Sequence, residues 1–237
     1  MKADYNHLEQ QLTIDLDLRR RPVAVAFLDA PPAGVEQYEG VQPSGCAFWR
    51  IASDGRTFYT VAHHHYNCPI GSYKHNLALP ADRAHELDDT LGLMTRIGYL
   101  RLAEVPQIPR LAATPGVVVY APLAATPVDP DVVLFWGRPG KVMLLQEAAL
   151  RAGVATGTQT LARPTCMILP AALSQGTVMS TGCIGNRVYT GLDDRELYLA
   201  VPGRDLVRVA RAASTIRTAN AILLEYHRGR QQELSPP

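Results

Sequence analysis

Four cysteines are the residues of this chain with the most distinctive chemistry: Cys46, Cys68, Cys166 and Cys183. Their successive separations are 22, 98 and 17 residues, so none has the two-residue spacing of a zinc knuckle or a ferredoxin motif. Four thiolates are nevertheless the ligand number of an iron–sulfur cluster and of tetrahedral zinc. We therefore predict a metal centre on these four thiols, with a [4Fe–4S] cluster favoured and zinc as the alternative. The opposing interpretation is that some of the four are ordinary buried small hydrophobes.

The cysteines fall into two similar local patterns. Cys46 and Cys166 each begin an apolar run that is typical of a helix, and Cys68 and Cys183 each follow a β-prone run and lie beside an Ile-Gly pair. We expect Cys46 and Cys166 in the first turn of a helix, where the helix dipole lowers the pKa of a thiol. We expect Cys68 and Cys183 in glycine-containing loops that fold closely around a ligand.

Polar residues near the cysteines supply further candidates. In an extended chain His63 and His65 share one face while His64 points away. We expect His65 or Lys74 to act as an acid or base, and Arg187 to pair with an anionic cofactor or a carboxylate substrate. The residues expected to border the cofactor are His63, Tyr66, Asn67, Gly71, Gly185, Asn186 and Tyr189. Loop packing is the alternative role for the histidines, and loop anchoring is the alternative role for Arg187.

The predicted role of the centre is redox chemistry, or activation of a small molecule at an open iron. Two other classes of function remain open. One is a binding module for a small or tetrapyrrole-like ligand, with an apolar pocket lined by Phe48, Trp49, Tyr66 and Tyr73. The other is a thiol enzyme with Cys68 as nucleophile and a histidine as base. Motif searches find no phosphate-binding glycine loop, no nucleophile elbow and no H-E-x-x-H zinc motif.

Hydrophobic periodicity predicts the elements that must position these residues. The predicted helices cover about residues 4–19, 80–97, 141–151, 165–174 and 205–227, with a short one after Ser44. The predicted strands cover 23–28, 57–62, 117–120, 132–136, 177–181 and 196–201. The stretch 63–76 is polar and rich in turn residues, so we expect a long loop there. This alternation predicts an α/β or α+β fold, with a mixed sheet and flanking helices.

Recurrence of the cysteine pattern suggests two weakly related halves within a single domain that spans residues 1–237. The repeat would cover about 22–106 and 117–203, and it matches Tyr99 to Pro106 with Tyr198 to Pro202. Chance similarity among common residue types is the alternative. If the repeat is real, a pseudo-twofold arrangement would bring the two cysteine pairs to one central site.

Composition excludes several classes of protein. The chain has 237 residues, of which 47% are hydrophobic, and a formal net charge of +1. Global disorder is therefore excluded, and no basic block favours nucleic acid. No apolar run is long enough to cross a membrane, and the N-terminus lacks a secretory signal, so we expect a cytoplasmic protein with reduced thiols. The expected partner is a small-molecule ligand or a redox protein, and the last helix offers a surface for a homodimer.

Several segments together resemble a known family. They are Gly45 to Trp49, His65 to Tyr73, Arg163 to Cys166 and Gly182 to Arg187, supported by Arg21 to Val25 and Leu197 to Gly203. The chain resembles the bacterial and archaeal family called "domain of unknown function 169" over about residues 8–225. The resemblance implies a single-domain cytoplasmic protein with cysteines at these positions, and it implies no activity.

Overall fold

The computed structural model describes residues 3–157 and 164–234. Six strands form one open sheet: β1 (Val23–Leu28), β2 (Phe58–Thr60), β3 (Val117–Pro122), β4 (Val132–Gly137), β5 (Val178–Ser180) and β6 (Leu197–Pro202). Their order is β2-β3-β1-β4-β6-β5, and the neighbouring strands pair antiparallel. Two isolated parallel bridges, Gln37 with Tyr59 and Thr156 with Thr177, extend the two ends. The predicted α/β or α+β class with flanking helices is confirmed, but the named strands form an antiparallel sheet and not the expected mixed one.

Both faces of the sheet are covered by helices, as alternation along the strands shows. In β4, Val132, Leu134 and Trp136 belong to one buried cluster, and Val133 and Phe135 belong to the other. Successive side chains of a strand point to opposite faces, so a strand buried on both sides is apolar throughout. The first cluster packs against α2 (Ala47–Ser53) and α6 (Ile168–Gln175), and the second against α1 (Tyr5–Leu16), α5 (Pro139–Arg151) and α8 (Leu206–Leu234).

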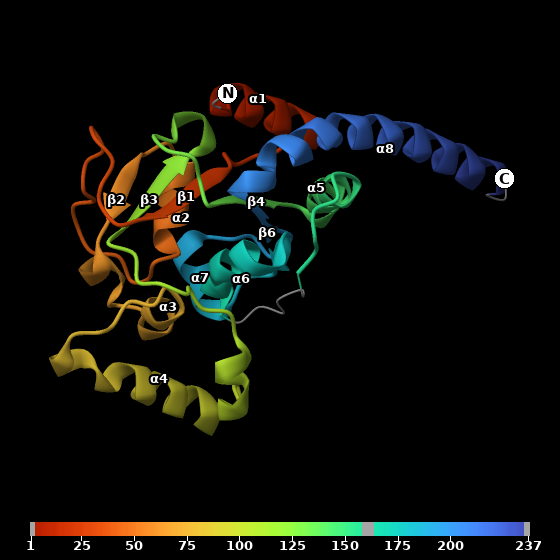
Figure 1. Ribbon diagram of the computed structural model, residues 1–237. Helices are drawn as coiled ribbons and strands as arrows, with labels where there is room; N and C mark the ends of the chain where they lie inside the picture. The colour runs from red at the N-terminus through yellow and green to blue at the C-terminus, as the bar shows by residue number, and fades with distance from the viewer. Residues whose placement is uncertain (1–2, 158–163, 235–237) are drawn as a thin grey trace.

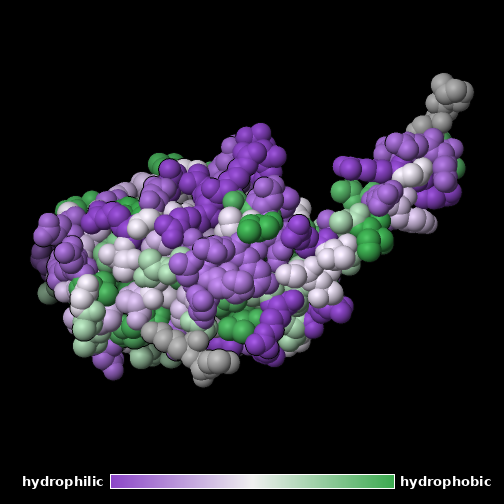
Figure 2. Space-filling model, turned by 90° about the horizontal axis from the view of Figure 1, so that it is seen from above, coloured by the Kyte–Doolittle hydropathy of each residue, from purple (hydrophilic) through white to green (hydrophobic). Residues whose placement is uncertain are grey.

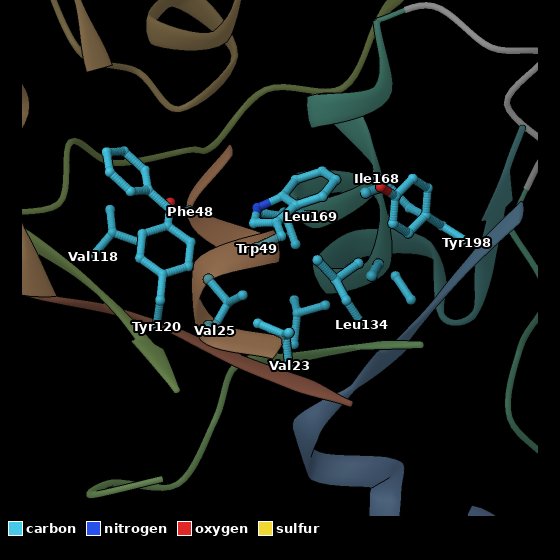
Figure 3. Close-up of a cluster of buried hydrophobic side chains, with 14 of the residues drawn as sticks. Val23, Val25, Phe48, Trp49, Val118, Tyr120, Leu134, Ile168, Leu169 and Tyr198 are labelled. Carbon is cyan, nitrogen blue, oxygen red and sulfur yellow. The ribbon is translucent and has the colours of Figure 1, made fainter. Parts of the chain in front are cut away.

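The first cluster supports the elements that carry the cysteines. Trp49 from α2 contacts the ring of Tyr198 edge to face, with the centroids 5.5 Å apart, and neither residue is exposed by more than 1%. Figure 3 shows Trp49 and Phe48 on α2 above Val23, Val25 and Tyr120 of the sheet. This packing fixes the start of α2, where Cys46 lies.

Three further helices lie beyond this layer. They are α3 (Pro69–Lys74), α4 (His85–Arg96) and α7 (Ile184–Thr190). Figure 1 shows α4 outermost on this side of the molecule, with α3 between it and the sheet. None of the α4 residues is buried. The stretch 63–76, expected to be a loop, instead forms a 3-10 turn (Ala62–His65) followed by α3, because Pro69 at the first helical position favours helix initiation.

The order of strands is the same in each half of the sheet when read outward from the centre. β1, β3 and β2 occupy the places that β4, β6 and β5 occupy on the other side. In this arrangement β3 is the counterpart of β6, whereas residues 99–106, which the sequence matched to β6, contain a 3-10 helix (Leu102–Gln107). That detail of the proposed repeat is therefore wrong, and the relation between the halves stays a prediction.

The last helix extends beyond the body of the protein. Its buried residues are Leu206, Val209, Ala210 and Ala213, all near its start. Figures 1 and 2 show the outer part of α8 projecting away, and Ile222, Leu223 and Tyr226 on it are exposed. The homodimer through this helix stays a prediction. Within the two described ranges, no helix is long and apolar enough to cross a bilayer.

Candidate functional site

A cavity of about 690 Å³ lies between α4 on one side and α3, α7, the start of α2 and the turn before α6 on the other. Its size falls within the range of roughly 300–1,000 Å³ that is typical of small-molecule sites. The four cysteines, from four separate segments, all border it. Of the other sequence-predicted residues, Asn67, Gly71, Lys74, Gly185, Asn186 and Tyr189 also border it. The cavity therefore brings together residues that are more than a hundred positions apart in the chain.

Each cysteine lies at the start of a helix. Cys46, Cys68 and Cys183 occupy the N-cap positions of α2, α3 and α7. Cys166 lies in a 3-10 turn (Thr165–Met167) that leads directly into α6. The expectation for Cys46 and Cys166 is confirmed in position, while Cys68 and Cys183 begin helices too and are not in open loops.

The thiols have few polar contacts. The Gly71 amide donates to Cys68 Sγ over 3.3 Å, and Cys46 Sγ lies 3.0 Å from the hydroxyl of Ser44. The Cys183 amide donates to the hydroxyl of Thr165, the residue before Cys166, so the two loops of this half are linked.

Burial, and not the helix dipole, dominates the thiol pKa values. Desolvation raises the pKa of Cys46 to about 12, although the contacts with Ser44 and Asn186 oppose it. Burial also raises the pKa of Cys68, and it raises the pKa of Cys166 well above its usual value. The other three thiols raise the pKa of Cys166 further, because a thiolate there would be near them. The expected lowering of the pKa at the helix starts is therefore wrong for the metal-free chain.

The side chains are exposed to the cavity even though protein surrounds them. Each cysteine is of intermediate exposure, and none forms a disulfide. Among the described residues, no group of three or more His, Cys, Asp or Glu side chains is arranged to hold one metal ion. The four thiols therefore border the cavity without forming a ready tetrahedron for a single ion such as zinc.

Asn186 is a buried polar side chain at this site. It is only 1% exposed, and it borders the cavity. Interaction with its amide lowers the pKa of both the Cys46 thiol and the Tyr198 hydroxyl, so the amide lies beside these two groups. The side chain has both donor and acceptor atoms, so it can also contact a polar group of a ligand in the cavity.

His75 is a site residue that the sequence analysis did not select. It borders the cavity beside α3, close to the backbone of Cys166. Burial lowers the pKa of His75 to about 4, so the imidazole is neutral at physiological pH. A prediction of helix for the residues that follow Cys68 would have placed His75 at the end of that helix, beside the site.

Lys74 is the buried cation of the site. It is 2% exposed, and its Nζ donates to the carbonyl of Ile108 over 3.2 Å. Burial lowers the pKa of Lys74 to about 8, while the nearby Cys166 thiol opposes this shift. An amine with such a pKa exists in both protonation states near neutral pH, as the predicted acid or base would require.

The histidine run does not reach the cavity. His65 is buried behind the Cys46 loop, where its Nε2 lies 2.8 Å from the Thr60 hydroxyl. Gly45 is tightly packed against this ring, because a Cβ on Gly45 would lie 2.8 Å from His65 Nδ1. His63 stacks on His64, with centroids 3.9 Å apart, and does not share a face with His65. The extended geometry expected for this run is wrong, because the run forms a 3-10 turn.

Other sequence-selected residues have structural roles. Arg187 donates to the carbonyls of Thr181 and Asp193 and pairs with Asp194, so it anchors its own loop. The Tyr66 carbonyl accepts a hydrogen bond from Arg83. Of the four aromatic residues expected to line a tetrapyrrole pocket, Tyr73 alone borders the cavity, and Phe48 and Trp49 are in the hydrophobic core.

We expect the metal-free protein to react slowly with thiol reagents. Iodoacetamide at neutral pH should label Cys46 at least about a hundredfold more slowly than free cysteine, because a raised pKa leaves little thiolate. Labelling should accelerate as the pH rises. Peptide mapping by mass spectrometry measures each site, and the urea-unfolded chain serves as the control. A single hyper-reactive Cys68 in the folded chain would contradict this expectation and favour the thiol-enzyme alternative.

Comparison with known proteins gives one match. The family model DUF169, described as an uncharacterised ArCR family, matches residues 11–212. Neither the search of curated proteins nor the search of solved structures gave a significant match. The matched range contains all four cysteines and the cavity, and it ends within the first part of α8. Because the family description carries no activity, the function must be argued from the cavity itself.

Proposed function

The chain belongs to the DUF169 family, and we propose that it holds an iron–sulfur cluster on Cys46, Cys68, Cys166 and Cys183. The observation that carries the proposal is that four separate segments bring every cysteine of the chain to one cavity. Structural cysteines that act as small hydrophobes would have no reason to share a single hollow. A shared cofactor explains the arrangement.

A cluster fits these thiols better than a single ion does. A zinc ion needs its sulfur ligands about 2.3 Å from one centre, and the described residues form no group of three or more side chains that could hold one ion. An iron–sulfur cluster contains several metal ions and is bound at its corners, so its ligands stand farther apart. Thiols that border one cavity without forming a single-ion site are therefore compatible with a cluster.

The surroundings of the thiols suit a negatively charged cofactor. The amide of Gly71 is already directed at Cys68 Sγ, and a backbone donor of this kind stabilises negative charge on sulfur. Asn186 lies beside Cys46 and lowers the pKa of its thiol. Binding to iron removes the thiol protons, which the raised pKa values otherwise retain.

A bound cluster would supply one-electron transfer. Around it, the chain contributes a buried setting, since protein surrounds Cys166 and α4 forms one wall of the cavity. Lys74 and neutral His75 are the residues at the cavity that can hold or move a proton. We therefore propose a redox role toward a small molecule that enters the same cavity, in place of the earlier candidates His65 and Arg187.

The proposal is tested by anaerobic reconstitution with iron and sulfide. We expect the protein to turn brown and to retain about four iron and four sulfide per chain after desalting. Visible absorption and electron paramagnetic resonance after dithionite reduction give the cluster type. A colourless protein without bound iron and sulfide, still folded by circular dichroism, would overturn the proposal and leave the cavity as a ligand-binding site without catalysis.

A further inference from the structure

We propose that the part of the cavity beneath α4 binds an apolar molecule that carries one carboxylate, and that this carboxylate pairs with Lys74. The inference goes beyond the cluster, because neither Lys74 nor α4 supplies any of the four cysteine ligands. It concerns the class of small molecule that the protein binds. Both sites share one cavity, so the ligand would lie beside the proposed cluster.

The chamber under α4 is apolar. Leu87, Leu91 and Met94 from α4 border it, together with Leu100, Val105 and Ile108 from the segment that follows. Because none of the α4 residues is buried, this helix presents its apolar side chains to a hollow and not to a packed core. A cavity lined in this way favours a ligand with a substantial hydrocarbon part.

Lys74 supplies the charged end of this chamber. An ammonium has three donor hydrogens, and Lys74 uses one for the Ile108 carbonyl. Among the described residues, no carboxylate lies within ion-pair distance of it, and the acidic residue that borders the cavity, Asp88, is exposed on α4. A buried cation without a counter-ion is destabilising, and a ligand carboxylate would relieve that cost.

Neighbouring groups increase the preference for an anion. The guanidinium of Arg110 lies over the Tyr73 ring, 4.4 Å from its centroid, and the Lys74 ammonium lies 4.7 Å from the centroid of the same ring. Arg110 is close enough to Lys74 to lower its pKa, so a second positive charge lies near this end of the cavity.

The test uses a fluorescent tetraene fatty acid, whose emission rises when it leaves water, and the methyl ester of the same acid. We expect saturable binding of both probes to the native protein, with the acid bound more tightly. The Lys74→Met variant keeps an unbranched side chain that is one heavy atom shorter and removes its charge. It should weaken binding of the acid by about tenfold or more and leave the ester unchanged.

Two further variants make the test specific. Lys141→Met removes a lysine that pairs with Asp17 on the opposite side of the sheet. It should leave the affinities for the acid and for the ester unchanged. Leu91→Trp fills the chamber from α4, where no side chain is buried. It should weaken the binding of both probes. Absence of saturable acid binding, or an equal loss of acid and ester in Lys74→Met, would overturn the inference. Iron content is measured in the same samples, so failure of the cluster and failure of the ligand site are distinguished.

Discussion

The Cys166→Ala protein should bind at least about tenfold less iron and sulfide than the native chain after anaerobic reconstitution. Cys166 is the most informative of the four, because it is near enough to Cys46, Cys68 and Cys183 to have its pKa raised by each of them. Removing it therefore removes the thiol that is close to all the others. Iron and sulfide assays with visible spectra measure the loss.

Met143→Ala provides the matched control for this variant. It also removes a sulfur-containing side chain, but from an exposed position on α5, across the sheet from the cavity. It should retain the full iron and sulfide content. If Cys166→Ala also retained full iron and sulfide while staying folded, a centre bound by the four thiols would be contradicted.

Gly203→Ala should destabilise the fold by about 3 kcal/mol or more. Gly203 follows β6, and its amide donates to the Asp131 carbonyl over 2.8 Å, just before β4. A Cβ at this position would lie 1.7 Å from the carbonyl oxygen of Pro130. The paired strands β4 and β6 must therefore separate at this end. Urea unfolding followed by circular dichroism measures the change in the free energy of unfolding.

Gly229→Ala is the control for backbone substitution. Gly229 lies in the projecting part of α8, and a Cβ there meets no atom within 4 Å. Alanine favours a helix by roughly 1 kcal/mol over glycine, so this variant should leave global stability unchanged or slightly raised. A Gly203→Ala protein as stable as the native chain would show that the contact with Pro130 is easily relaxed.

Some features of the four cysteines can be predicted from the sequence, and others cannot. The helix starts at Cys46 and Cys166 follow from the apolar runs after them. That all four cysteines border one cavity was a hypothesis drawn from a repeat that itself stays a prediction. The thiol pKa values could not be predicted, because desolvation depends on the aromatic core and α4, which come from distant parts of the chain. The local helix dipole alone predicts a lowered thiol pKa, which is the wrong direction.

The polar residues also differ in how well the sequence predicts their positions. His65 and Lys74 are nine positions apart and equally plausible from composition, yet one is buried behind Gly45 and the other borders the cavity. That difference depends on the 3-10 turn and on α3, which the sequence analysis took for a loop. His75 was missed for this reason, because its side chain reaches the cavity only through the helix that precedes it.

The chamber under α4 was also absent from the sequence analysis. The segment after Pro80 was predicted as a helix, and α4 confirms this, but periodicity does not reveal what the apolar face of a helix covers. Here the face covers a hollow next to a buried lysine. A lysine with no acidic neighbour in sequence looks like any surface residue until the fold encloses it.

The most direct test of the cluster is iron K-edge X-ray absorption on the anaerobically reconstituted protein. We predict iron surrounded by sulfur, with a second shell of iron–iron scattering, and the loss of both shells in Cys166→Ala. Iron bound only by oxygen and nitrogen, or iron–sulfur coordination without an iron–iron shell, would contradict the assignment of a cluster to these four cysteines.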